Sequence, residues 1–150
     1  MLCVRSYRRL VLWCFFALGM SCWAATSATA QISVVVAKNS KVTIDKMTKA
    51  EVKKIFAGVK LKWKDGGKIQ IIDQPETDIG VKFYKAVLGK SHMQVHKQWL
   101  KLLLSGQASA PLKAPSDAEV KKMVSRHAYA IGYIAANNLD DSVREILRVD

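Results

Sequence analysis

Short β-branched runs alternate with helix-start signals along residues 31–150, and this alternation limits the possible folds more than any other feature of the sequence. Residues 31–37 and 68–72 are apolar runs of strand length without clean alternation, which is typical of strands buried on both faces. Residues 130–135 and 143–149 are two later strand candidates. Strands separated by helices predict a single α/β domain in which helices flank a central, mostly parallel sheet.

Hydroxyl side chains mark four predicted helix starts. At such a position the hydroxyl accepts a hydrogen bond from an amide of the first turn that has no partner within the helix. The four capping residues are Thr48, Thr77, Ser91 and Ser116, with Asp78 as an alternative start for the second helix. Gly58 and Gly89 are placed to end the first two helices. Residues 106–115 contain two prolines and are predicted to form a loop.

Residues 1–30 have the order of a secretory signal peptide: arginines, an apolar stretch, and small residues that end in Ala28-Thr29-Ala30. The apolar stretch is shorter than the roughly 18 to 20 residues that cross a bilayer. We therefore expect cleavage after Ala30 and a periplasmic domain formed by residues 31–150. The alternative is a lipoprotein, with the lipid attached to Cys22.

All three cysteines lie within residues 1–30, so we expect no disulfide, cysteine metal site or thiol nucleophile in the exported domain. No Ser/His/Asp arrangement, phosphate-cradling glycine loop or pair of catalytic carboxylates stands out. The sequence therefore predicts a non-enzymatic protein without a cofactor. The formal charge of the chain is +12, and the predominance of lysine favours diffuse attraction to anions over bidentate recognition.

Two further patterns each have a functional and a structural interpretation. His92 and His96 are four residues apart on a predicted helix and could reach one metal ion, although we expect surface histidines and no metal site. Eight lysines between residues 46 and 68 surround Trp63. Peripheral contact with acidic head groups is one interpretation of these lysines, and a solvated face is the other. Arginine stacking and repeated aromatics are lacking, which argues against specific nucleic-acid binding.

Several segments align in order with one known family; they are VVVAKNSKVT, KKIFAG, KWKDGGKI, IIDQPETD before FYKAVLGK, WLKLLLSG, SDAEVKKMV and AIGYI. Together they resemble the periplasmic phosphate-binding subunit of phosphate ABC transporters, of the type II periplasmic-binding-protein-like superfamily. In that family two α/β lobes close on the anion, and the matched segments belong to the second lobe. The resemblance implies a single lobe, phosphate or another small anion as ligand, and a transporter permease or sensor protein as partner. A dimer would rebuild the cleft.

The resemblance also implies an anion site where a helix follows the second strand. In the family the loop Arg-Ser-Asp-Gly-Ser-Gly-Thr holds phosphate there through hydroxyls, a guanidinium and helix-terminal amides. In an alignment without gaps, Asp73 takes the arginine position of this loop and Thr77 keeps a hydroxyl, whereas Glu76 and Asp78 replace glycines. Three carboxylates near a helix start repel phosphate. A second interpretation therefore stays open, an interaction module that has lost solute binding and docks on a protein or membrane partner.

The residues that we expect to contact an anion are Thr77 and the amides near Asp78, with Asn39 and Ser40 as the second wall of the site. Each has a structural alternative. Thr77 is suited to be an ordinary helix cap, and Asn39 and Ser40 are suited to form a polar turn.

Overall fold

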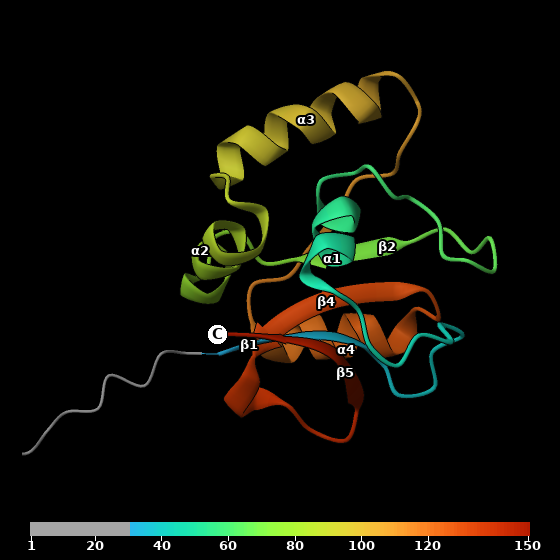
Figure 1. Cartoon of the computed structure of the whole chain (residues 1–150), viewed down its shortest axis with the longest axis vertical. Coiled ribbons are helices and arrows are strands. Elements are labelled where there is room, and N and C mark those ends of the chain that lie inside the picture. The colour runs from blue at the N-terminus through green and yellow to red at the C-terminus, as the bar shows by residue number, and fades with distance from the viewer. Residues whose placement is uncertain (1–30) are drawn as a thin grey trace, which may run out of the picture.

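A computed structural model describes residues 31–150 (Figure 1). The predicted signal peptide and Cys22 lie outside the described residues. The described part has five strands in one sheet, in the order β3-β2-β4-β1-β5. The strands are β1 (Ile32–Ala37), β2 (Gln70–Asp73), β3 (Leu112–Lys113), β4 (Ala130–Ala135) and β5 (Val143–Val149). The helices are α1 (Lys49–Phe56), α2 (Asp78–Phe83), α3 (His92–Leu104) and α4 (Asp117–Arg126), with a π-helical turn η1 (Tyr84–Leu88) and a 3-10 turn η2 (Ala136–Asn138).

Strand β1 runs against all its sheet neighbours. It pairs antiparallel with β4 and with β5, whereas β2 pairs parallel with β3 and with β4. The strands β2, β3, β4 and β5 therefore point in one direction and β1 alone points in the other. The predicted α/β class is confirmed, and the sheet is mostly parallel in strand direction although two of its four pairings are antiparallel.

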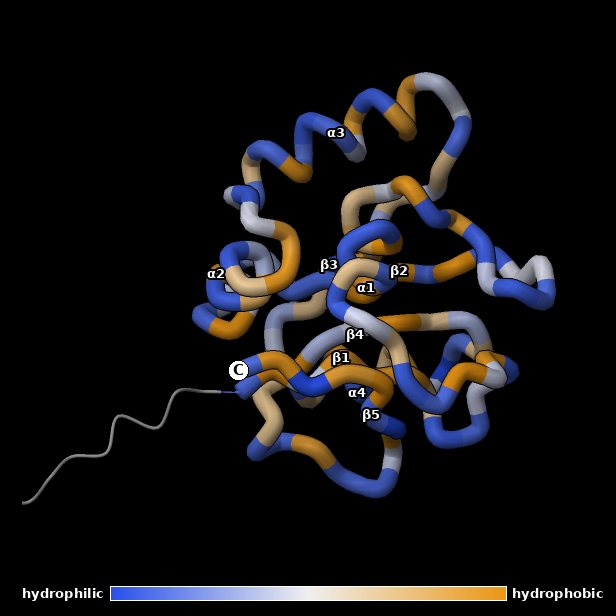
Figure 2. Tube along the Cα trace, in the orientation of Figure 1, coloured by the Kyte–Doolittle hydropathy of each residue, from blue (hydrophilic) through white to orange (hydrophobic). Residues whose placement is uncertain are grey.

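Both faces of the sheet are covered, which explains why the central strands β1 and β4 are buried along nearly their whole length. Val34 and Val36 of β1 pack into the cluster that contains α1, α2, η1 and α3 residues. The alternate residue Val35 packs with Val120 and Val124 of α4 on the opposite face. Because successive side chains of a strand point to opposite faces, an unbroken β-branched run suits a sheet with a core on each side. Figure 2 shows the resulting apolar strands in the centre of the molecule.

The predicted helix starts are confirmed at all four positions: Thr48, Thr77, Ser91 and Ser116 each accept a hydrogen bond from an amide of the following helix. Gly58 and Gly89 follow helices with positive φ angles of 73° and 64°. The predicted loop 106–115 contains β3, a strand of two residues that the sequence pattern did not predict. None of the helices within residues 31–150 is long and apolar enough to cross a bilayer.

Candidate binding cleft

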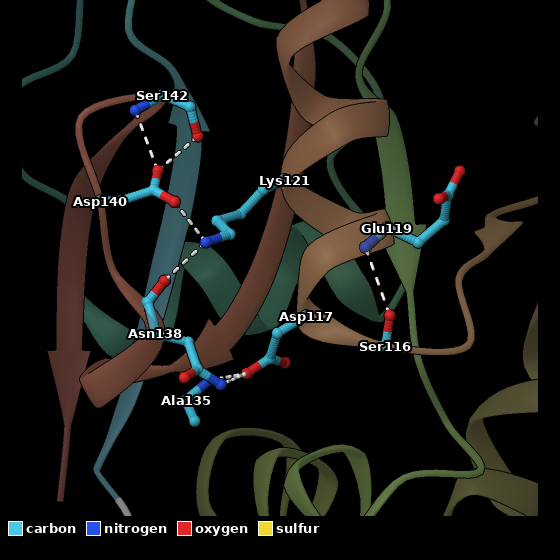
Figure 3. A network of polar contacts seen from close by, with 8 residues as sticks. All are labelled: Ser116, Asp117, Glu119, Lys121, Ala135, Asn138, Asp140 and Ser142. Atoms are coloured by element: carbon cyan, nitrogen blue, oxygen red, sulfur yellow. Dashed lines mark hydrogen bonds and ion pairs between the residues drawn. The ribbon is translucent and has the colours of Figure 1, made fainter.

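An open cleft of about 550 Å³ lies where β2 and β4 end and where α2 and α4 begin. Helix α2 follows β2, and helix α4 follows β3, the parallel neighbour of β2, so the two helices start close together at one edge of the sheet. Ligands of open α/β sheets bind at such edges. The cleft is lined by Gln74, Thr77, Asp78, Ile79, Pro115, Ser116, Asp117, Ala118, Lys121 and Asn138. Figure 3 shows the wall that α4 and the chain after β4 provide.

The first wall is the N-terminus of α2. The Thr77 hydroxyl accepts a hydrogen bond from the Gly80 amide at 3.1 Å and donates one to the Gln74 carbonyl at 2.8 Å. Thr77 is therefore a helix cap whose only proton is already used, and any donor to an anion comes from the backbone. The amides of Asp78 and Ile79 precede the first bond of the helix, which the Val81 amide donates to the Thr77 carbonyl at 3.0 Å.

The second wall is the N-terminus of α4, which Asp117 fixes to its surroundings. The Asp117 carboxylate accepts hydrogen bonds from Asn138 Nδ2 at 2.7 Å and the Ala135 amide at 2.9 Å (Figure 3). It also accepts one from Gln74 Nε2 at 2.6 Å. These bonds tie the first turn of α4 to the ends of β2 and β4. The Asp117 charge is thus surrounded by donors and forms part of the framework of the cleft.

One turn further along α4, Lys121 is held by the chain after β4. Its ammonium group pairs with the Asp140 carboxylate and donates to the Asn138 carbonyl at 2.9 Å (Figure 3). Hydrogen bonds from Lys121 and then Ser142 lower the pKa of Asp140 to about 2. The positive charge of Lys121 is therefore partly neutralised by Asp140.

A buried polar network lies beneath the cleft. The Asp73 carboxylate, 6% exposed, accepts hydrogen bonds of 2.6 Å from both the Tyr84 and the Tyr133 hydroxyl. Burial, together with the negative charge of Asp73, raises the pKa of both tyrosines. The expectation that Asp73 adds a third carboxylate at the helix start is thus wrong, because its side chain turns into the core between the two phenols.

Gln74 joins this network to the cleft. Its amide nitrogen Nε2 donates to Asp117 and, at 2.8 Å, to the Tyr133 carbonyl, so the orientation of the side-chain amide is set by two acceptors. Its oxygen Oε1 is buried and has no hydrogen-bond partner among the described residues. An unpaired buried acceptor is costly and rare in folded proteins.

The predicted second wall of Asn39 and Ser40 does not lie at this cleft. The Ser40 hydroxyl donates to the Ala128 carbonyl at 2.7 Å, just before β4 begins. Because β1 is antiparallel to β4, the loop after β1 lies at the opposite edge of the sheet from Thr77. That part of the site prediction is wrong, and Ser40 instead forms a turn, with its oxygen accepting from the Val42 amide at 3.1 Å.

The polar lining residues that the sequence did not predict as part of a site are Gln74, Ser116, Asp117, Lys121 and Asn138. Ser116 was recognisable as a helix cap. That the starts of α2 and α4 lie at the same cleft depends on the strand order, which the sequence pattern does not give.

The two histidines of the metal hypothesis have ring centroids 5.8 Å apart. His92 packs edge-on against Tyr84, with 5.3 Å between ring centroids. Within residues 31–150, no cluster of three or more His, Cys, Asp or Glu side chains could hold a metal ion.

No family model and no curated protein matches the sequence. Several solved structures are similar to the fold. One is a phosphate ABC transporter substrate-binding protein from Clostridium perfringens, solved with bound phosphate, at a TM-score of 0.57 and 20% identity. Others are an ABC-type phosphate transport receptor from Vibrio cholerae, at 0.56 and 19%, and PstS from Borrelia burgdorferi, at 0.57 and 18%.

The chain shares the fold of these phosphate-binding proteins. The similarity covers 78% of this chain in each comparison, and it covers 45%, 46% and 47% of the three solved chains. The resemblance seen in the sequence is thereby confirmed at the level of the fold. The chain matches a little under half of each of these larger proteins.

Proposed function

We propose that this protein is an exported, non-enzymatic, solute-binding-like protein that binds a small oxyanion such as phosphate in the cleft between α2 and α4. The observation that carries the proposal is the convergence of two capped helix N-termini on one open cleft. Each first turn offers amides without an intrahelical partner, and the helix dipole favours negative charge there.

The donors are the backbone amides of Asp78 and Ile79 on one wall and of Asp117 and Ala118 on the other. Two carboxylates and one ammonium group line the cleft. The Asp117 carboxylate already has three donors, so the exposed Asp78 carboxylate is the main source of repulsion. This charge favours a protonated oxyanion of low charge over a fully ionised one.

Gln74 supports the same ligand class. A bound oxyanion that keeps a proton can donate a hydrogen bond. Gln74 lines the cleft, and its buried Oε1 is an acceptor without a partner among residues 31–150. We propose that the hydroxyl of a protonated phosphate, or a water molecule bound with it, completes the hydrogen bonds of Gln74.

The sequence and the fold together support a cellular location and a biological role for this protein. The signal-like residues 1–30 and the likeness to substrate-binding proteins of ABC transporters support a periplasmic location and a role in phosphate uptake or sensing. Because the chain corresponds to part of those proteins, we propose that the opposing wall comes from a transporter permease, a sensor protein or a second copy of the chain.

Titration calorimetry with inorganic phosphate tests the cleft. Asp78→Asn is expected to tighten phosphate binding by about tenfold, because it removes a negative charge close to the amide donors. Asp65→Asn is the matched control: it removes the same charge from a distant turn and retains the oxygen that accepts the Gly67 amide at 3.0 Å.

Equal affinities of Asp78→Asn and Asp65→Asn would place the anion elsewhere. If no heat is observed from micromolar to millimolar phosphate with either variant or with the unaltered protein, solute capture is excluded. The interaction module is then the better description.

A further inference from the structure

Helix α3 has two apolar faces, and only one of them packs against the domain. Val95 and Trp99 are buried on the inner face, with 1% and 6% exposure. On the other side, Met93, Leu100 and Leu104 are 67%, 47% and 81% exposed. Spacings of seven and four residues place these three side chains on one face of a helix. We call Met93, Leu100 and Leu104 the outer α3 face.

The outer α3 face is at an extreme of the molecule. Figure 1 shows α3 at one end of the longest axis, apart from the sheet. The exposed Val59 lies close to α3, since a Cβ at the preceding Gly58 would meet Leu102 of this helix at 2.4 Å. Four of the five exposed large apolar side chains of residues 31–150 are thus on α3 or next to it.

Lysines border this apolar stripe. Lys97 and Lys101 are exposed on α3. Lys97 is one helical turn after Met93, and Lys101 directly follows Leu100. Neither lysine forms an ion pair within the described part of the chain. The sequence of α3, HMQVHKQWLKLLL, contains no acidic residue. The surface therefore combines exposed apolar side chains with unpaired positive charge.

We propose that the outer α3 face binds an anionic lipid surface. Leucine and methionine side chains enter the boundary between head groups and acyl chains, while lysines extend along it to anionic head groups. This interaction is independent of the cleft, which lies between α2 and α4.

The size and charge of the outer α3 face favour lipid over a protein partner. A helix of 13 residues is about 20 Å long, and its three apolar side chains cover much less than the roughly 800 Å² per partner of a stable protein interface. In a second copy packed face to face, the lysines of both helices would border the same contact and repel each other. A lipid surface requires no such area and supplies the opposite charge.

Co-sedimentation of the exported protein with vesicles tests this proposal. We expect binding to vesicles of phosphatidylcholine mixed with phosphatidylglycerol, and little binding to phosphatidylcholine alone. Lys97→Gln/Lys101→Gln is expected to lower the partition coefficient about fivefold for each lysine at low salt. Leu100→Ser/Leu104→Ser is expected to lower it by about tenfold or more.

Matched variants control for charge and for apolar exposure. Lys122→Gln/Arg126→Gln removes two positive charges from α4, and Val81→Ser removes a side chain on α2 that is 62% exposed. Both are expected to bind vesicles like the unaltered protein. Any residues that cleavage leaves before residue 31 are common to all variants, so they do not affect the comparison.

The proposal is overturned if anionic vesicles do not bind the protein, or if the α3 variants and the controls lose binding equally. It is also overturned if the protein forms dimers in solution that Leu100→Ser/Leu104→Ser dissociates, since the outer α3 face would then bind a second copy.

Discussion

Asp73 illustrates how one buried side chain determines what lies beneath the cleft. Its two carboxylate oxygens each accept one phenol proton, from Tyr84 and from Tyr133. The Tyr133 hydroxyl also accepts a hydrogen bond from the backbone amide of Gln74 at 3.2 Å. The phenol therefore connects the Asp73 carboxylate to a residue of the cleft wall. Loss of either phenol leaves a buried acceptor with fewer donors, which is more costly than the net gain from forming such a bond.

The two phenols are expected to make folding sensitive to alkaline pH. Their pKa values are raised in the folded protein, so above the ordinary tyrosine pKa of about 10 the unfolded chain releases protons that the folded protein retains. Below that pH the contribution of these groups to stability is fully present and does not change with pH. Above it, stability falls by up to about 1.4 kcal/mol per pH unit for each tyrosine.

Urea unfolding of the unaltered protein and of Tyr84→Phe and Tyr133→Phe, at a series of pH values, measures this effect. Each variant is expected to be about 1–3 kcal/mol less stable at neutral pH and to lose less stability as pH rises. All other titratable groups are the same in the three proteins, so the difference between the curves isolates the tyrosines. Parallel curves would show that the phenols titrate normally.

At the scale of elements, the start of α2 is pressed against the end of β2. A Cβ at Gly80 would lie 2.1 Å from the Gln74 carbonyl oxygen. Helix propensity alone makes Gly→Ala favourable by about 1 kcal/mol, but a clash with backbone atoms requires the helix to move.

Gly80→Ala is therefore expected to destabilise the protein by about 1–3 kcal/mol in urea unfolding and to weaken phosphate binding, because the first turn of α2 shifts away from Gln74. Val81→Ala, at the exposed next residue, is expected to change stability by less than about 0.5 kcal/mol. A stabilising effect of Gly80→Ala would contradict the close approach of α2 and β2.

Local signals predicted most elements but not their arrangement. The caps at Thr48, Thr77, Ser91 and Ser116 and the strands of residues 130–135 and 143–149 were evident because capping and β-branched runs are short-range patterns. Strand β3 was missed because two residues carry no periodicity. The place of Asn39 and Ser40 depended on the direction of β1, which is set by pairing with β4 and β5 nearly one hundred or more residues away.

The sequence also did not predict that the Asp73 side chain points into the core. A carboxylate next to a helix start normally indicates surface charge near the helix dipole. Here two tyrosines, 11 and 60 residues further along the chain, provide donors inside the core. Side-chain orientation at the end of a strand follows from such distant partners, so the expected residues of the cleft could be corrected only in three dimensions.

At the scale of the whole molecule, an acidic cleft is set in a basic protein. The chain has 24 basic and 12 acidic residues, a formal charge of +12, so its positive groups repel one another and salt is expected to stabilise the fold by screening. Sodium chloride and sodium phosphate at equal ionic strength screen alike. Only a bound ion stabilises further, by about 2.7 kcal/mol when its concentration is one hundred times the dissociation constant.

Thermal unfolding in matched low-millimolar salts therefore separates screening from binding. We expect the melting temperature to rise modestly with chloride and by roughly 10 °C more with phosphate near saturation. Asp78→Asn is expected to enlarge the phosphate increment and leave the chloride increment nearly unchanged, because the substitution acts within the cleft. Leu100→Ser/Leu104→Ser is expected to change neither increment, since the outer α3 face is separate from the cleft. If phosphate and chloride stabilise equally in every variant, the positive charge of the molecule attracts anions only diffusely, and the two helix starts hold none.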